Sequence, residues 1–308
     1  MRRTVKKAVR FRGVGLHGGQ PVVLTVAPAA AETGIVFRRT DAGPAARPIL
    51  ARYDLVHDTH LCTRLSNDDG LSIGTVEHLM AALAGCGISD ARIAVDGPEV
   101  PIMDGSAVVF VREFMRVGIR DLGVPWRAIR VLEPVSVRME GKLAELTPAP
   151  RFEMEFSISF ADPAIGGQSK YLALAGGAIV SELSDSRTFG CLADVERLRR
   201  MGLGRGGSLE NAVIVDNGRV LNPEGLRHPD EFVRHKMLDA VGDLALAGAP
   251  IIGRYTGIKA GHEMSNLLLR KLFSCPEVWT WCELRPGQGP GGTPHPPAVH
   301  ASDVSIAV

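Results

Sequence analysis

Apolar positions along this 308-residue chain follow two spacings, one typical of strands and one typical of helices. Short alternating or β-branched runs predict strands at residues 21–26, 35–37, 91–95, 128–132, 135–138, 142–146 and 152–160. Apolar positions three and four residues apart predict helices at residues 75–84, 108–117, 195–201, 229–247 and 262–273. We expect Thr75 to cap the first helix and Gly85 to end it.

The order of these elements indicates an α+β fold with two similar domains, each a β-sheet layered against helices. A length of 308 residues agrees with two domains. We place the first domain at residues 1–124 and the second at residues 125–284. Residues 285–308 are dense in Gly and Pro, so we expect a poorly ordered tail.

Composition narrows the class of protein. Lys and Arg number 35 and Asp and Glu 34, so the net charge of +1 argues against a nucleic-acid binder. Five scattered cysteines argue against a disulfide framework and favour a reducing compartment. The basic N-terminus lacks the apolar run of a secretory signal, and no apolar stretch is long enough to cross a bilayer. We therefore expect a cytoplasmic protein without a transmembrane anchor.

The segment at residues 232–243 carries the first candidate chemistry. His235 and Asp239 are four residues apart, so on a helix their side chains leave the same face one turn apart, and Asp243 extends the row. An imidazole and a carboxylate are suitable zinc ligands, and three protein ligands leave a position open for water. The same spacing also arises by chance on a solvated helix face.

A third ligand must come from elsewhere, and Glu77-His78 is the best candidate. Here a metal ligand would sit beside a carboxylate that can take a proton from water. The alternative is a solvent-facing helix start, where the helix dipole favours Glu77. His262 begins another predicted helix and is either a structural cap or a proton donor.

Six motifs in order carry a family resemblance: TVEHLMAALAG, PIMDGSA, SRTFG, GGSLENA, FVRHKMLDAVGDL and GHEMSN. Together they resemble the UDP-3-O-acyl-N-acetylglucosamine deacetylases, the zinc amidases of lipid A biosynthesis. The resemblance runs from about residue 3 to about residue 273. It implies an active site at the domain junction and removal of acetate from a UDP-3-O-acyl-N-acetylglucosamine.

By that resemblance, His78, His235 and Asp239 bind a catalytic Zn²⁺, and Glu77 is the general base. The tetrahedral oxyanion would be stabilised by the metal and by Thr188.

The resemblance also implies that Lys236 adds positive charge, that His262 protonates the leaving amine, and that Asp243 orients His262.

The resemblance further implies an amphiphilic UDP-sugar substrate. A small insertion near residues 190–216 would form a hydrophobic passage for the acyl chain, with Phe160 stacking on uracil and Lys142 near the diphosphate. The remaining substrate contacts would be Phe189, Val195, Leu209, Ala212 and Ile214. For each passage residue, ordinary packing is the alternative.

Two other classes of function stay open at this point. One is a non-catalytic protein that binds the metal or the nucleotide sugar, which would not need Glu77 as a base. The other is nucleic-acid binding, but Arg197, Arg199 and Arg200 form too short a basic run to support it. We expect a monomer, and the amphiphilic substrate would allow weak association with a membrane.

Overall fold

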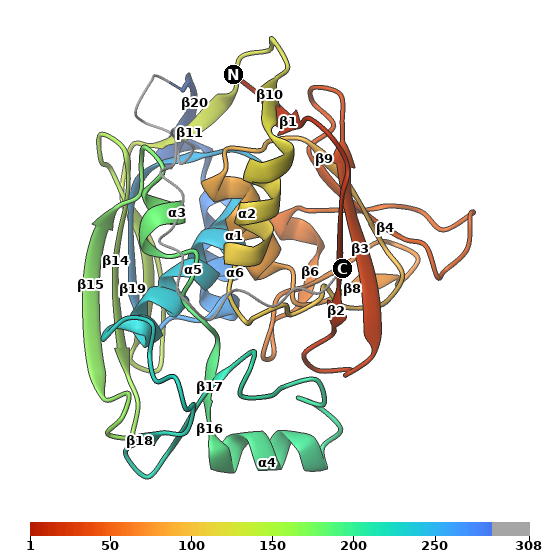
Figure 1. Ribbon diagram of the computed structural model, residues 1–308. Coiled ribbons are helices and arrows are strands. Elements are labelled where there is room, and N and C mark those ends of the chain that lie inside the picture. The colour runs from red at the N-terminus through yellow and green to blue at the C-terminus, as the bar shows by residue number, and fades with distance from the viewer. Residues whose placement is uncertain (285–308) are drawn as a thin grey trace.

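The computed structural model describes residues 1–284 and has helices between two main β-sheets (Figure 1). The first sheet has the strand order β2-β3-β9-β4-β5, and only β4 and β9 pair in parallel. Its strands are β2 (Val9–Val14), β3 (Pro21–Pro28), β4 (Ile35–Arg39), β5 (Ile49–Leu50) and β9 (Ala91–Val95). Alternate residues such as Phe11, Leu24 and Phe37 are buried, which places one face of the sheet on the core.

The second sheet has seven strands centred on β19 (Ile251–Ile258). This strand pairs in parallel with β11 and β14 and antiparallel with β13. The other strands are β11 (Arg127–Val131), β12 (Val135–Met139), β13 (Lys142–Thr147), β14 (Phe152–Ser159), β15 (Gly167–Ala173) and β20 (Trp279–Glu283).

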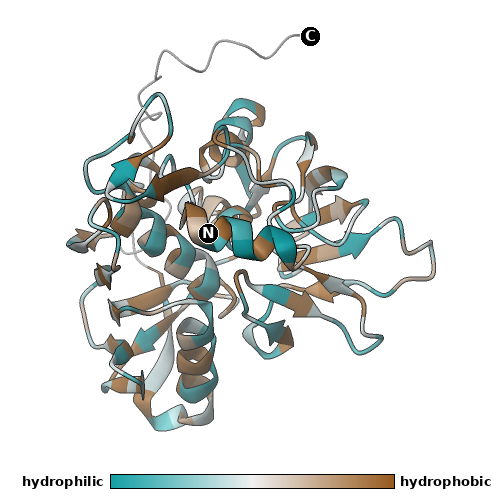
Figure 2. Ribbon diagram, turned by 90° about the horizontal axis from the view of Figure 1, so that it is seen from below, coloured by the Kyte–Doolittle hydropathy of each residue, from teal (hydrophilic) through white to brown (hydrophobic). Residues whose placement is uncertain are grey.

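Six α-helices occur within residues 1–284. They are α1 (Glu77–Gly85), α2 (Val108–Val117), α3 (Ala178–Glu182), α4 (Leu192–Arg200), α5 (Glu231–Ala245) and α6 (His262–Ser274). In Figure 1, α1, α2, α5 and α6 fill the space between the sheets, whereas α4 lies at the lower edge. Helices and strands carry both hydrophobic and hydrophilic residues (Figure 2), as expected for elements with one buried face.

The remaining elements are short. Three-stranded sheets join β6 (Val56–Asp58), β7 (Arg64–Ser66) and β8 (Ser72–Ile73), and β16 (Phe189–Cys191), β17 (Val213–Asp216) and β18 (Arg219–Val220). A two-stranded sheet pairs β1 (Arg3–Val5) with β10 (Ile119–Asp121). Short 3₁₀ helices span Tyr53–Leu55 and Pro276–Val278.

The α+β class is confirmed, and each predicted helix and strand is present, most of them with ends shifted by one to three residues. One detail is wrong: Thr75 does not cap α1. Its φ is +56°, its hydroxyl donates to Glu99 Oε1 at 2.9 Å, and Val76 occupies the N-cap position. The hydroxyl is thus held by a carboxylate, and the helix begins two residues later than predicted.

Two of the organisational predictions stay untested. The proposed boundary between residues 124 and 125 falls between β10 and β11, and the predicted tail, residues 285–308, lies outside the described residues. None of the helices within residues 1–284 combines the length and the apolar character that crossing a bilayer requires.

Helices α1 and α5 touch at Gly242, where only a glycine fits. A Cβ at this position would lie 2.0 Å from the carbonyl oxygen of Glu77. This close approach brings the first turn of α1 against the C-terminal half of α5, so side chains from both helices can meet.

Candidate active site

His78 on α1 meets His235 and Asp239 on α5. The nearest ligand atoms of the three side chains lie within 4.8 Å of one another. Nε2 of each histidine is 3.3 Å from Asp239 Oδ1. All three residues are buried, and Oδ1 has no hydrogen-bond partner. A buried carboxylate oxygen without a partner, facing two imidazole nitrogens, fits a divalent metal ion.

The surroundings orient these side chains. His235 Nδ1 lies 3.0 Å from the carbonyl oxygen of Ser186. Because a carbonyl only accepts, Nδ1 carries the proton, and the lone pair of Nε2 points toward Asp239. Lys236 Nζ donates to the other oxygen, Asp239 Oδ2, at 2.7 Å. These hydrogen bonds leave Asp239 Oδ1 and the Nε2 atoms of the two histidines available to bind a cation.

The charges of the group agree with this arrangement. Burial alone would raise the pKa of Asp239, but His235 and Lys236 hold that pKa well below its usual range. Burial lowers the pKa of His235 to about 4. Burial also acts to lower the pKa of His78, but the adjacent Asp239 carboxylate outweighs it and raises that pKa. An ionised Asp239 beside a neutral His235 is ready to bind a cation.

Glu77 and His262 form an acid–base pair next to the metal group. His262 Nε2 is 3.9 Å from Glu77 Oε1, and Nδ1 is 3.0 Å from Asp243 Oδ2. Burial raises the pKa of Glu77. Burial alone would lower the pKa of His262, but the nearby charge of Asp243 raises it to about 9. One side chain is thus suited to taking a proton and the other to holding one.

A cavity of about 360 Å³ opens beside this centre. Phe189 connects the two, since its ring lies on the cavity wall and its centroid is 6.0 Å from that of His235. Thr188 lines the cavity, and its backbone N–H donates to Gly105 at 2.8 Å. The apolar lining includes all four predicted passage residues, Val195, Leu209, Ala212 and Ile214. They come from α4, the segment after it and β17.

Phe160 and Lys142 lie at one edge of the seven-stranded sheet. Leu143 on β13 and Ser157 on β14 both pair with Ile258, from opposite sides of β19. Lys142 and Phe160 lie just beyond these two positions and therefore at the same end of the strands. Both side chains are exposed. Phe160 also packs edge-to-face on Phe189, with a centroid distance of 5.4 Å, and so reaches the cavity wall. No contact joins Lys142 to the metal group.

Two groups at the site, Thr63 and His17, were not predicted from the sequence. Thr63 donates its N–H to Glu77 Oε2 at 3.1 Å and its hydroxyl to Asp243 Oδ1 at 2.6 Å. His17 lines the cavity with both ring nitrogens buried and unpartnered, while Glu99 Oε1 accepts its backbone N–H at 2.9 Å. A lone threonine carries no sequence signal for such a role, but the glycine-rich segment around His17 could have indicated a binding loop.

Known proteins are similar to this chain along most of its length. The sequence profile of the family described as "UDP-3-O-acyl N-acetylglycosamine deacetylase" matches residues 2–274. The chain is similar to proteins named UDP-3-O-acyl-N-acetylglucosamine deacetylase from Phenylobacterium zucineum (strain HLK1), Myxococcus xanthus (strain DK1622) and Shewanella sp. (strain W3-18-1).

The first of these is 51% identical over 276 residues, which cover 90% of this chain and 94% of the relative. The second is 51% identical over 278 residues, with 90% and 88% covered, and the third is 48% identical over 279 residues, with 90% and 91% covered. This chain belongs to the UDP-3-O-acyl N-acetylglycosamine deacetylase family.

Proposed function

We propose that this protein removes acetate from a UDP-3-O-acyl-N-acetylglucosamine with Zn²⁺ as its metal, the committed step of lipid A biosynthesis. The observation that carries the proposal is the convergence of His78, His235 and Asp239 next to Glu77 and His262. The products are acetate and the free amine of the UDP-3-O-acyl-glucosamine. A two-histidine, one-carboxylate set is typical of a catalytic metal site that keeps a position open.

An amide is a poor electrophile with a poor leaving group, so hydrolysis needs help at both ends. When bound, the metal ion supplies Lewis acidity, which polarises the amide carbonyl and makes water easier to deprotonate. Glu77 takes the proton from the attacking water, for which its raised pKa suits it. The backbone N–H of Thr63 holds the other carboxylate oxygen and keeps Glu77 oriented.

His262 then gives its Nε2 proton to the departing amine nitrogen. The Asp243 carboxylate holds Nδ1 and keeps the ring cationic until that transfer. Lys236 and Thr188 are the proposed donors to the negative charge that develops on the amide oxygen.

The rest of the substrate extends away from the metal group. The apolar cavity under α4 is proposed to hold the acyl chain, with Phe189 at its inner end. Phe160 offers an exposed ring for the uracil, and Lys142 offers a charge for the diphosphate at the same sheet edge. We further propose a cytoplasmic monomer with domains at residues 1–124 and 125–284 and the active site at their junction.

The test is acetate release from that substrate by metal-stripped protein reloaded with one equivalent of zinc. We expect turnover to return with zinc and to stay absent after chelation. A His78→Ala variant, reloaded in the same way, controls for metal bound elsewhere. Folded, zinc-loaded protein that binds the nucleotide sugar without releasing acetate would instead indicate a binding protein.

A further inference from the structure

Helix α5 carries a buried carboxylate, Glu231, that has no role in the proposed reaction. Glu231, His235, Asp239 and Asp243 follow one another at four-residue intervals, so each lies beside the next along the helix surface. Every one of them is buried, and Glu231 is fully inaccessible to solvent. A buried carboxylate is stable only when it is paired and hydrogen-bonded.

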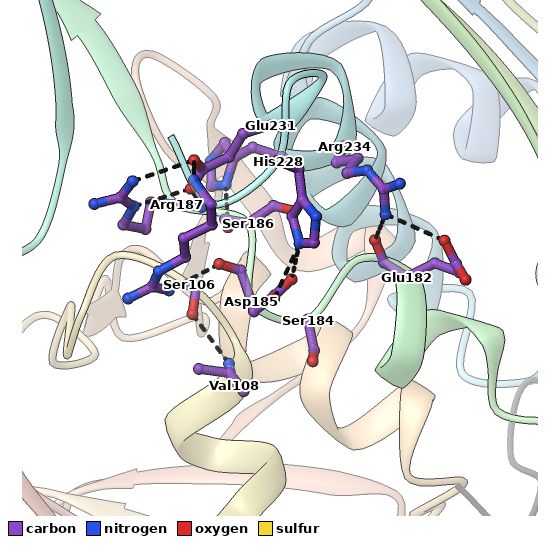
Figure 3. A network of polar contacts seen from close by, with 12 residues as sticks. Ser106, Val108, Glu182, Ser184, Asp185, Ser186, Arg187, His228, Glu231 and Arg234 are labelled. Atoms are coloured by element: carbon purple, nitrogen blue, oxygen red, sulfur yellow. Dashed lines mark hydrogen bonds and ion pairs between the residues drawn. The ribbon is translucent and has the colours of Figure 1, made fainter. Parts of the chain in front are cut away.

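The partner of Glu231 is Arg187, which is only 1% exposed. Glu231 Oε1 accepts both the backbone N–H of Arg187 at 3.0 Å and the guanidinium Nε–H at 2.9 Å. The same guanidinium donates to the carbonyl of Gly225 at 2.7 Å. Figure 3 shows Arg187 and Glu231 turned toward each other. Main chain and side chain of Arg187 are thus fixed to the first turn of α5.

The residue before Arg187 contacts the next turn of the same helix. The carbonyl of Ser186 accepts the Nδ1 proton of His235 at 3.0 Å. Ser186 and Arg187, which are adjacent in sequence, therefore bind His235 and Glu231, which are one turn apart on α5. On the other side, the backbone N–H of Ala107 donates to Ser184 at 2.9 Å and that of Thr188 to Gly105 at 2.8 Å.

We propose that the Arg187–Glu231 ion pair positions the metal ligand His235. It fixes the Ser186 carbonyl relative to α5, and that carbonyl sets the tautomer and the ring orientation of His235. The inference rests on the proposed role of His235 as a ligand. Groups that orient a ligand in this way typically change metal affinity about 10- to 100-fold when they are removed.

Zinc affinity tests the proposal without turnover. In Arg187→Met we expect zinc to bind about 10- to 100-fold more weakly, measured by competition with a chromophoric chelator. We also expect the visible absorption bands of the cobalt-loaded protein to shift, because they report ligand geometry. Arg187→Lys keeps the charge without the planar fork, so it should regain part of the affinity.

Arg234→Met is the matched control. Arg234 lies on α5, next to His235 in sequence, and pairs with Glu182 (Figure 3). It makes a second ion pair with Asp230. No contact joins it to Ser186, so its loss should leave zinc affinity and the cobalt spectrum unchanged. Equal losses in both variants would overturn the proposal, and so would wild-type affinity and an unchanged spectrum in Arg187→Met.

Arg187→Met leaves Glu231 buried without its partner, which threatens folding. The double variant Arg187→Met/Glu231→Gln removes both charges together, and its amide oxygen can still accept one of the two backbone N–H groups that Glu231 binds, those of residues 187 and 227. Weak zinc binding in this folded double variant supports the proposal, and full affinity overturns it. A wild-type protein that binds no zinc would instead refute the proposed function.

Discussion

The metal group is built on two helices whose inward faces are buried, whereas the neighbouring cavity is walled by short strands and by α4, a helix with no buried residue. The ligand atoms belong to residues no more than 5% exposed, while Leu209 on the cavity wall is 40% exposed. Geometry within a fraction of an ångström needs tightly packed supports. An apolar passage needs only a suitable shape, so it tolerates a looser scaffold. Substitutions should therefore act on turnover in the first region and on substrate affinity in the second.

The largest effect is expected from Glu77→Gln. Glutamine keeps the size of the side chain but cannot take a proton, so turnover should fall about 10²- to 10⁴-fold while zinc still binds. Acetate release and bound zinc, measured on one preparation, check this. Glu153→Gln removes a buried carboxylate on β14, where it pairs with Arg254, and should leave turnover unchanged. Normal turnover in Glu77→Gln would remove this residue from the mechanism.

Gly242→Ala tests the close packing of α1 on α5. Helix propensity alone would favour alanine by about 1 kcal/mol. The added Cβ, however, would meet the Glu77 carbonyl oxygen at 2.0 Å, and overpacking of this kind costs about 1–3 kcal/mol. We expect a lower melting temperature and weaker zinc binding, because the helices must move apart. A variant that is more stable and fully active would show that the contact is not needed.

The pH dependence of turnover should carry the signature of His262. Its pKa is raised to about 9, so the proton for the leaving amine is present at neutral pH, and kcat/KM should fall as pH rises through that value. Asp243→Asn removes the charge that raises this pKa, and it should move the alkaline limb to lower pH. Asp96 is an exposed carboxylate that directly follows β9 of the first sheet, and Asp96→Asn should leave the alkaline limb where it is. An unmoved limb in Asp243→Asn would contradict the assignment.

The smallest effect is expected in the cavity. Leu209→Ala should raise KM a few-fold with little change in kcat or in melting temperature, since a half-exposed leucine contributes little to the core. Met201→Ala serves as the control, because Met201 follows α4, is 62% exposed and does not line the cavity. A large loss of kcat in Leu209→Ala would mean that the cavity wall also positions the reacting groups.

Local pattern predicted the local structure well. The apolar spacing predicted α2 with the same ends as in the structure, Val108–Val117. The four-residue spacing placed His235 and Asp239 one turn apart, which they are on α5. Both predictions depend only on neighbouring residues and on the period of the helix.

What the sequence could not supply depends on contacts between distant segments. The residues alone offered His78 only as a candidate, because its meeting with His235 requires α1 to lie against α5. The pairing of Arg187 with Glu231 joins residues 44 positions apart, and neither carries a local signal. In the two main sheets, strands β2, β5, β15, β19 and β20 were not predicted. For β15 the reason is a polar, partly exposed sequence without an apolar alternation. Thr75 was misread because a tertiary contact with Glu99 outweighed its capping preference.

The most direct test of the metal group is X-ray absorption at the zinc edge of the zinc-loaded protein. We expect two imidazoles in a shell of nitrogen and oxygen at about 2.0–2.1 Å. One imidazole should disappear in His78→Ala. A sulfur shell at about 2.3 Å, or an imidazole count that His78→Ala leaves unchanged, would contradict the joining of α1 and α5 at one metal ion.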